Sequence, residues 1–211
     1  MEALSTPMLR HTPLTGLARP FASGSATPAS LERLAVTLEG RVPGSIGHSY
    51  RVAAYAEDLA RGLGLSVAET RRVRRAAVLH DIGKVKLPEG ILNKPAPLSE
   101  EELELVQRHA DIGAGIVAEL GDPELAAIVR HHHECFDGSG YPAGLAGEEI
   151  PLGARILAVA DTFDALTSDR PYRPAIGYPR ALAVLDEIAG TQLDPSVVVL
   201  FERRYALLAA A

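Results

Sequence analysis

The histidines of this 211-residue chain are unevenly placed and mostly lie near acidic residues. Three of the seven stand in a row at His131–His133, and His80 is followed directly by Asp81. Imidazole and carboxylate groups can bind a metal ion together, transfer protons, or only form hydrogen bonds inside a core. The spacing of each group from its apolar neighbours indicates which of these uses applies.

Most of these polar residues continue an apolar stripe of a helix. His48 precedes Val52 by four residues and His80 follows Ala76 by four, so each shares a helix face with its apolar neighbour. The same relation places the whole set on inward faces: His48, His80, His109, His132, His133 and Asp161, with Asp81 adjoining. We therefore expect these side chains to converge inside the protein.

A single histidine on an apolar stripe is most often a hydrogen-bonded core residue and not a metal ligand. Five imidazoles with two carboxylates are a different case, because buried charge is costly without a partner. Lys84 could satisfy one of the two acids, but not both together with the imidazoles. A metal cluster would satisfy all seven groups, and a set without thiolate suits Fe, Mn, Co, Ni or Zn.

Seven ligands exceed what one tetrahedral ion takes. The set therefore predicts two divalent transition-metal ions, with an aspartate between them, and the adjacent pair His80-Asp81 is well placed for this. Two neighbouring ions can lower the pKa of a bound water and hold a phosphate diester for in-line attack. The chemistry that the ligands predict is metal-assisted phosphohydrolysis.

The elements that must carry these residues are predicted to be helices. Ser66 and Ser99 each begin a capping box, while Asp122 and Asp194 each precede a proline as N-caps. The expected helices are 31–38, 45–62, 66–82, 99–110, 122–130, 151–166 and 194–208. No segment shows the apolar-polar alternation of a convincing strand. Residues 197–200 are the only candidate strand, and the helix cap that precedes them favours a helix. The prediction is an all-α domain.

Composition limits the kinds of partner and the cellular location that the protein can have. The chain is 47% hydrophobic with a net charge of −6, which argues against DNA binding, and no apolar run could cross a membrane. A single cysteine excludes an internal disulfide and favours a cytoplasmic location. Residues 1–28 are rich in Ser, Thr, Pro and Gly, so we expect a flexible tail there and one domain over 29–211.

Several motifs carry a family resemblance. The run from His80 to Lys84, HDIGK, resembles the signature of the HD superfamily of metal phosphohydrolases. Residues 132–142 resemble the HHE-x-x-DG-x-GYP motif of the HD-GYP family of cyclic di-GMP phosphodiesterases, as do residues 47–53, 94–95 and 160–173. The resemblance covers about residues 31–201. It implies an HD-domain helical bundle with a C-terminal GYP-type extension that hydrolyses cyclic di-GMP to pGpG, and it leaves open whether GMP follows.

The resemblance also implies roles for single residues. The metal ligands match His48, His80, Asp81, His109, His132, His133 and Asp161. Asp81 and Lys84 match catalytic positions, Lys84 lying near the scissile phosphate. Gly140, Tyr141, Arg170 and Arg173 match substrate-binding positions, and Gly138 shapes the same turn. Taken alone, the glycines could form only a turn, Tyr141 could only pack, and the arginines could pair with Asp164 or Asp169.

Three positions differ from the family pattern or add to it. Some members carry a glutamate four residues before the first ligand histidine, where this chain has Gly44, so we expect two metal ions and not three. Cys135 replaces a common basic residue and is expected to pack as a small hydrophobe. His131 is the extra histidine, expected to be exposed or to support the ligands.

Two other functions stay open at this point. Some relatives act as cyclic-dinucleotide sensors or protein-interaction modules with little turnover, and others hydrolyse another cyclic dinucleotide such as cyclic GMP-AMP. The expected metals are Fe or Mn first, then Zn, Co or Ni. The expected partners are cyclic di-GMP, signalling proteins of the same pathway, and a second copy of the chain in a homodimer, with no DNA and no membrane.

Overall fold

The structure is a computed structural model that describes residues 28–169 and 174–206. Within these ranges it contains ten α-helices and two 3-10 helices, and β-pairing is limited to one isolated bridge between Ala189 and Leu193. The predicted all-α fold is confirmed. The expected N-terminal tail and two expected substrate-binding residues, Arg170 and Arg173, lie outside the described residues.

The first half of the chain forms α1 (Pro28–Arg41), α2 (Ser45–Gly62), α3 (Val67–Leu79), the 3-10 helix η1 (Ile82–Lys86), α4 (Glu89–Leu92) and α5 (Glu100–Gln107). The second half forms α6 (His109–Ala118), α7 (Pro123–Arg130), η2 (Gly147–Glu149), α8 (Leu152–Thr167), α9 (Tyr178–Glu187) and α10 (Pro195–Tyr205). None of the helices in the described ranges is both long enough and apolar enough to cross a bilayer.

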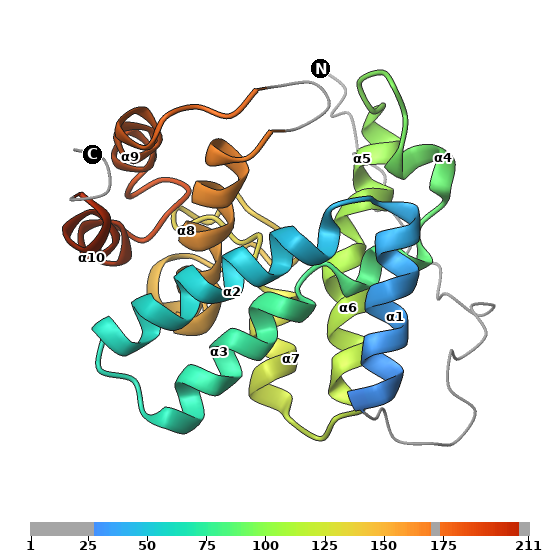
Figure 1. Cartoon of the computed structure of the whole chain (residues 1–211), viewed down its shortest axis with the longest axis horizontal. Helices are drawn as coiled ribbons and strands as arrows, with labels where there is room; N and C mark the ends of the chain where they lie inside the picture. Colours follow the sequence, from blue (N-terminus) through green and yellow to red (C-terminus); the bar gives the residue numbers. More distant parts are fainter. Residues whose placement is uncertain (1–27, 170–173, 207–211) are drawn as a thin grey trace, which may run out of the picture.

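Helix α2 crosses the molecule and packs against α3 and α8, while α6 lies beside α7 and η1 (Figure 1). The buried side of α2 is rich in alanine, including Ala53, Ala56 and Ala60. Small side chains allow neighbouring helices to approach closely, and the larger buried groups Leu59 and Phe163 fill the space that remains. The centre of this bundle is where the predicted ligands must meet.

An aromatic cluster attaches the C-terminal helices to the bundle. Tyr55 of α2 contacts Phe163 of α8 with ring centroids 5.3 Å apart and Phe201 of α10 at 5.9 Å. Phe201 in turn stacks on Tyr205 at 4.4 Å. Phe163 also contacts Tyr178 at the start of α9, with ring centroids 5.2 Å apart. Helices α9 and α10, at one end of the view in Figure 1, therefore share the core of the bundle.

The predicted caps are present. Ser66 and Ser99 form complete capping boxes with Glu69 and Glu102, and Asp122 accepts the backbone N–H of Leu125 at the start of α7. Such caps satisfy backbone donors that have no partner within the helix. The starts of these helices were therefore predictable from a few adjacent residues.

Helix ends and short helices were predicted less well. The helix expected over 66–82 ends at Leu79, and the one expected over 99–110 divides at Arg108 into α5 and α6. The short helix α4 and the amphipathic helix α9 were not predicted, although α9 places Pro179 in its first turn and buries Ala181 and Leu185.

The early end of α3 has a packing cause at Gly83. A β-carbon at Gly83 would lie 2.0 Å from the carbonyl oxygen of His109, so only glycine lets η1 approach α6 this closely. The chain leaves the α3 helix at His80, three residues before this approach. The adjacent pair His80-Asp81 is thereby brought to the N-terminus of α6.

Candidate metal centre

Six elements or their ends bring the predicted ligands together. His48 lies in the first turn of α2, His80 and Asp81 lie between α3 and η1, His109 begins α6, His132 and His133 follow α7, and Asp161 lies in α8. His80, Asp81, His109 and His132 are buried, and the other three are partly buried. The prediction that these side chains point inward agrees with this burial.

The groups form two clusters. In what we call the His48 cluster, ligand atoms of His48, His80 and Asp81 lie within 4.8 Å of one another. In the His109 cluster, the same holds for His109, His132 and His133.

Asp81 belongs to the His48 cluster and also reaches the His109 cluster. Its Oδ2 is 3.6 Å from His80 Nε2, and its Oδ1 is 3.5 Å from His109 Nε2. The two oxygens of one carboxylate thus face histidines of different clusters. Asp161 adds a further carboxylate at the edge, with Oδ1 3.2 Å from His48 Nε2.

Three of the histidines have a defined tautomer. His80, His109 and His132 each donate Nδ1–H to the backbone carbonyl three residues earlier, at 2.7 to 2.8 Å. A carbonyl oxygen only accepts, so Nδ1 carries the proton and the neutral ring presents the Nε2 lone pair. In each case this lone pair belongs to the nitrogen that faces the clusters.

The donor set fits a metal ion. His109 Nε2 and His132 Nε2 lie 3.4 Å apart, so two lone pairs face each other inside the protein. Burial lowers the pKa of His109, and burial together with the neighbouring imidazoles lowers the pKa of His132 well below its usual range. Burial also lowers the pKa of His133 to about 4. Protons are therefore disfavoured between these nitrogens, and a divalent cation would satisfy them.

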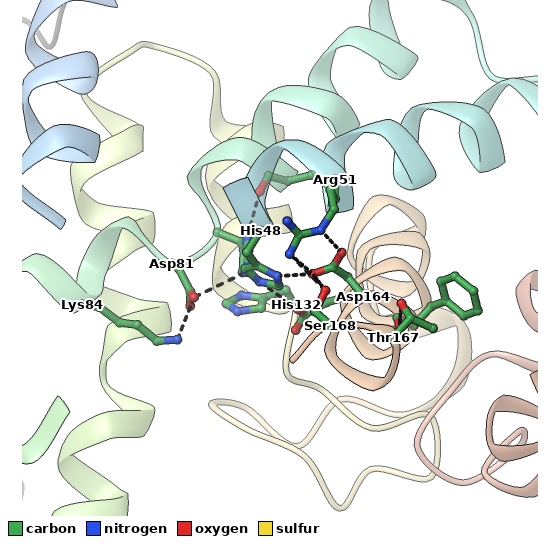
Figure 2. A network of polar contacts seen from close by, with 12 residues as sticks. His48, Arg51, Asp81, Lys84, His132, Asp164, Thr167 and Ser168 are labelled. Atoms are coloured by element: carbon green, nitrogen blue, oxygen red, sulfur yellow. Dashed lines mark hydrogen bonds and ion pairs between the residues drawn. The ribbon is translucent and has the colours of Figure 1, made fainter. Parts of the chain in front are cut away.

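Asp81 is kept in its charged form. Burial favours the neutral acid, but the charge of Lys84 outweighs it and holds the pKa of Asp81 well below its usual range. Lys84 Nζ donates to Asp81 Oδ2 at 2.7 Å and points toward the site in Figure 2. The predicted catalytic pair is thus in direct contact at the junction of the clusters.

His48 has a different environment from the other ligands. Burial opposes a positive ring, but hydrogen bonds to Asp161 and Asp164 outweigh it and raise the pKa of His48 to about 9. Asp164 is almost fully buried and also accepts hydrogen bonds from Arg51 and Ser168. Asp164 and Arg51 were not predicted as site residues. Each lies three positions after a predicted ligand on the same helix, and this spacing could have revealed both.

The predicted substrate-binding turn packs against the His109 cluster. The Tyr141 ring lies over His133 with centroids 4.9 Å apart, and its backbone N–H donates to the His133 carbonyl at 3.2 Å. A β-carbon at Gly140 would lie 2.2 Å from the backbone nitrogen of Cys135. The absence of a side chain at Gly140 therefore lets the turn close beside the cluster.

Glu134 holds this turn in place and was missed in the sequence. Its buried carboxylate accepts the backbone N–H groups of Ala143, Gly144 and Leu145 at 2.8, 3.0 and 3.2 Å. His131 Nδ1 lies 3.1 Å from the same carboxylate, so the extra histidine supports the turn and is largely buried. We call residues 138–145 the GYP strap.

Two smaller expectations also have outcomes. Cys135 was expected to be a small buried hydrophobe, and it is only partly buried. At Gly44, φ is +89°, and the nearby Glu39 carboxylate accepts the backbone N–H groups of Gly44 and Ile46, both at 2.7 Å. Glu39 thereby caps the start of α2. The number of metal ions stays a prediction.

Comparisons with known proteins agree with this geometry. A family model described as HD domain matches residues 32–197. A 3'3'-cGAMP-specific phosphodiesterase 3 of Vibrio cholerae is 42% identical over 172 residues, covering 81% of this chain and 37% of the relative. The cyclic di-GMP phosphodiesterase response regulator RpfG of Xanthomonas campestris is 44% identical over 172 residues, covering 80% and 46%. The chain thus spans less than half the length of these relatives.

Solved structures show the same fold. A cyclic GMP-AMP specific phosphodiesterase of V. cholerae superposes with a TM-score of 0.63 at 21% identity, covering 83% of this chain and 48% of the other. Bd1817, an HDG"Y"P protein from Bdellovibrio bacteriovorus, superposes with a TM-score of 0.62 at 23% identity, covering 77% and 52%.

Proposed function

The chain belongs to the HD-domain family, with relatives of the HD-GYP type, and we propose that it is a metal-dependent phosphodiesterase acting on cyclic di-GMP. The observation that carries this proposal is the position of Asp81, whose two oxygens face two histidine clusters while Lys84 contacts the same carboxylate. Paired clusters of this composition are suited to a phosphate diester, because the substrate is anionic and its hydrolysis requires an activated water.

We assign one ion to each cluster. The His48 cluster would hold one ion together with Asp161, and the His109 cluster would hold the other, with Asp81 of the His48 cluster facing both. When bound, the ions supply positive charge at the phosphate and a water of lowered pKa.

The chain's own residues supply the remaining functions. Lys84 places an ammonium group beside Asp81, where it can stabilise charge on the phosphoryl oxygens during attack. The ring of Tyr141 covers His133 and forms one wall of the site. We assign Gly140 and Tyr141, together with Arg170 and Arg173, to binding the dinucleotide. Addition of one water to phosphorus would break the bond to the 3′-oxygen, which takes up a proton, and give linear pGpG. A second addition of water would be needed to give GMP.

A second substrate is favoured by a specific finding. One relative at 42% identity is named as specific for 3'3'-cGAMP, while another at 44% is named for cyclic di-GMP. Both dinucleotides carry the same phosphodiester ring and differ in one base. 3'3'-cGAMP is therefore the alternative substrate.

The experiment compares both substrates with and without metal. Protein purified without oxygen is loaded separately with Fe(II) and Mn(II), and the nucleotides are separated by chromatography. We expect metal-dependent pGpG or GMP from the wild type. Because Asp81→Ala removes the carboxylate that faces both clusters, we expect it to lower turnover at least about 1000-fold.

Asp111→Ala is the matched control. Asp111 is paired with Arg130, and the Asp111 side chain is 52% exposed. It should retain wild-type turnover. Full turnover by Asp81→Ala would disprove the mechanism. Binding of cyclic di-GMP without any product from metal-loaded wild type would identify a sensor instead.

A further inference from the structure

Asp164 is a buried acid that contacts the metal centre without belonging to either cluster. It lies on α8 one turn after Asp161, and its side chain is 2% exposed. Its Oδ2 lies 2.7 Å from His48 Nδ1, on the side of the ring opposite the nitrogen that faces Asp161. Figure 2 shows Asp164 joined by dashed lines to both His48 and Arg51.

His48 needs a partner of this kind because of its place in a helix. His80, His109 and His132 stand just after the last residues of α3, α5 and α7, where backbone carbonyls lack partners within the helix. Each ring uses one of those carbonyls. His48 stands in the first turn of α2, where the carbonyls accept the helix's own N–H groups. Its orienting acceptor must come from another element, and Asp164 lies 116 positions away in the chain.

Arg51 and Ser168 keep this acceptor in its charged form. Arg51 Nε donates to Oδ1 at 2.6 Å and Nη2 donates to Oδ2 at 3.0 Å, a two-point contact, while Ser168 Oγ lies 3.3 Å from Oδ2. A buried carboxylate is stable as an anion only when it is paired in this way. Arg51 lies on α2 three residues after His48. The same helix therefore carries the ligand His48 and the arginine that keeps Asp164 in its carboxylate form.

We propose that Asp164 is a positioning residue that orients His48 for the metal ion of the His48 cluster, with Arg51 holding Asp164 as a carboxylate. An anionic acceptor on Nδ1 fixes the ring orientation and makes Nε2 a stronger electron donor. The three histidines held by neutral carbonyls lack this support. The inference rests on the metal centre of the proposed function, but it concerns ion affinity and not turnover.

The test counts ions and measures their affinity in the full chain. Wild type and Asp164→Asn are titrated with Mn(II) against a competing chelator, and bound ions are counted by mass spectrometry. We expect Asp164→Asn to bind the ion of the His48 cluster about 10- to 100-fold more weakly, as is typical for loss of a partner behind a ligand. The ion of the His109 cluster should bind as in wild type. At a suitable free Mn(II) concentration the variant then holds about one ion where wild type holds two.

Asp194→Asn is the matched control. Asp194 is also buried, and it also bonds an arginine and a serine, with Arg155 Nη1 at 2.6 Å and Ser196 Oγ at 2.6 Å. It contacts neither cluster, so this variant should keep both ions. Arg51→Gln is a second and milder test, because the Arg51 side chain is 49% exposed, and it should weaken the same ion several-fold.

Each outcome has a distinct meaning. Wild-type affinity for two ions in both Asp164→Asn and Arg51→Gln would overturn the inference. Equal weakening of both ions in those variants, with loss of helical circular dichroism, would show a merely structural role and also overturn it. A wild type that binds no ion at all would overturn the proposed function itself, and the inference with it. Selective loss of one ion supports the inference, whichever dinucleotide proves to be the substrate.

Discussion

Lys84 shows how a single side chain can act on the reaction without holding the metal. Its ammonium group is 2.7 Å from Asp81 Oδ2, and the side chain is 26% exposed, so it lies at the open edge of the site. Several ligands surround Asp81, and removing one neighbouring cation leaves them in place. Lys84 is therefore expected to affect turnover more than ion binding.

We predict that Lys84→Met keeps the metal content of the wild type and lowers kcat about 100- to 1000-fold, the usual effect of removing one group that stabilises transition-state charge. The measurements are ion counting and steady-state hydrolysis of cyclic di-GMP on the same samples. Lys86→Met is the control, since Lys86 is an exposed lysine of the same 3-10 helix. Loss of ions in Lys84→Met, or unchanged kcat, would refute the assigned role.

Among the elements, the GYP strap illustrates how backbone contacts place a side chain. Three consecutive backbone N–H groups converge on the Glu134 carboxylate, and Tyr141 donates its own N–H to the His133 carbonyl. Gly140 lies where the strap passes closest to the segment that carries the histidines. These contacts hold the strap with Tyr141 over His133.

We predict that Gly140→Ala raises KM and lowers stability by about 1–3 kcal/mol, because the added methyl group meets backbone atoms that cannot rotate away. For a chain of this size such a loss lowers Tm by roughly 2–12 °C. Thermal unfolding and hydrolysis at varied substrate concentration measure the two effects. Gly115→Ala in α6, where a β-carbon meets no atom within 4 Å, should leave KM unchanged and should not lower Tm, because alanine favours a helix interior more than glycine does. Unchanged Tm and KM in Gly140→Ala would contradict the close contact.

For the whole molecule, the C-terminal helices depend on ion pairs as well as on the aromatic cluster. Asp194 at the start of α10 bonds Arg155 of α8, and Arg204 pairs with Asp58 of α2. Burial tends to raise the pKa of Asp194, but the hydrogen bonds from Ser196 and Arg155 outweigh it and lower the pKa below its usual range. The folded protein therefore binds the Asp194 proton less readily than the unfolded chain does.

This direction gives a pH dependence with a definite sign. A lowered folded-state pKa contributes stability above the unfolded value of about 4, and the contribution disappears as pH falls through the folded value. We predict that the unfolding free energy of wild type exceeds that of Asp194→Asn by a constant amount from pH 7 to about 5. The difference should shrink below about pH 4. Urea denaturation of both proteins in EDTA measures it, and a difference that grows on acidification would contradict the assignment.

Local sequence determined much of this molecule. Capping boxes at Ser66 and Ser99 need only residues three apart, and the apolar stripes that direct His80 and His132 inward need only one or two turns of helix. Both signals depend on short-range backbone hydrogen bonds and on side-chain period. The helical class and the ligand types could therefore be predicted from adjacent residues.

Tertiary packing decided how those residues combine. The pairing of His48 with Asp164 joins α2 to α8, and the approach of Asp81 to the His109 cluster depends on Gly83 lying against α6. Glu134 acts on a turn that begins several residues later, through backbone groups that carry no sequence signal. Such contacts depend on how helices pack across the core, and helical period does not specify that packing. The sequence alone thus determined which groups could bind metal, and the fold determined which of them face one another and which buried acids support them.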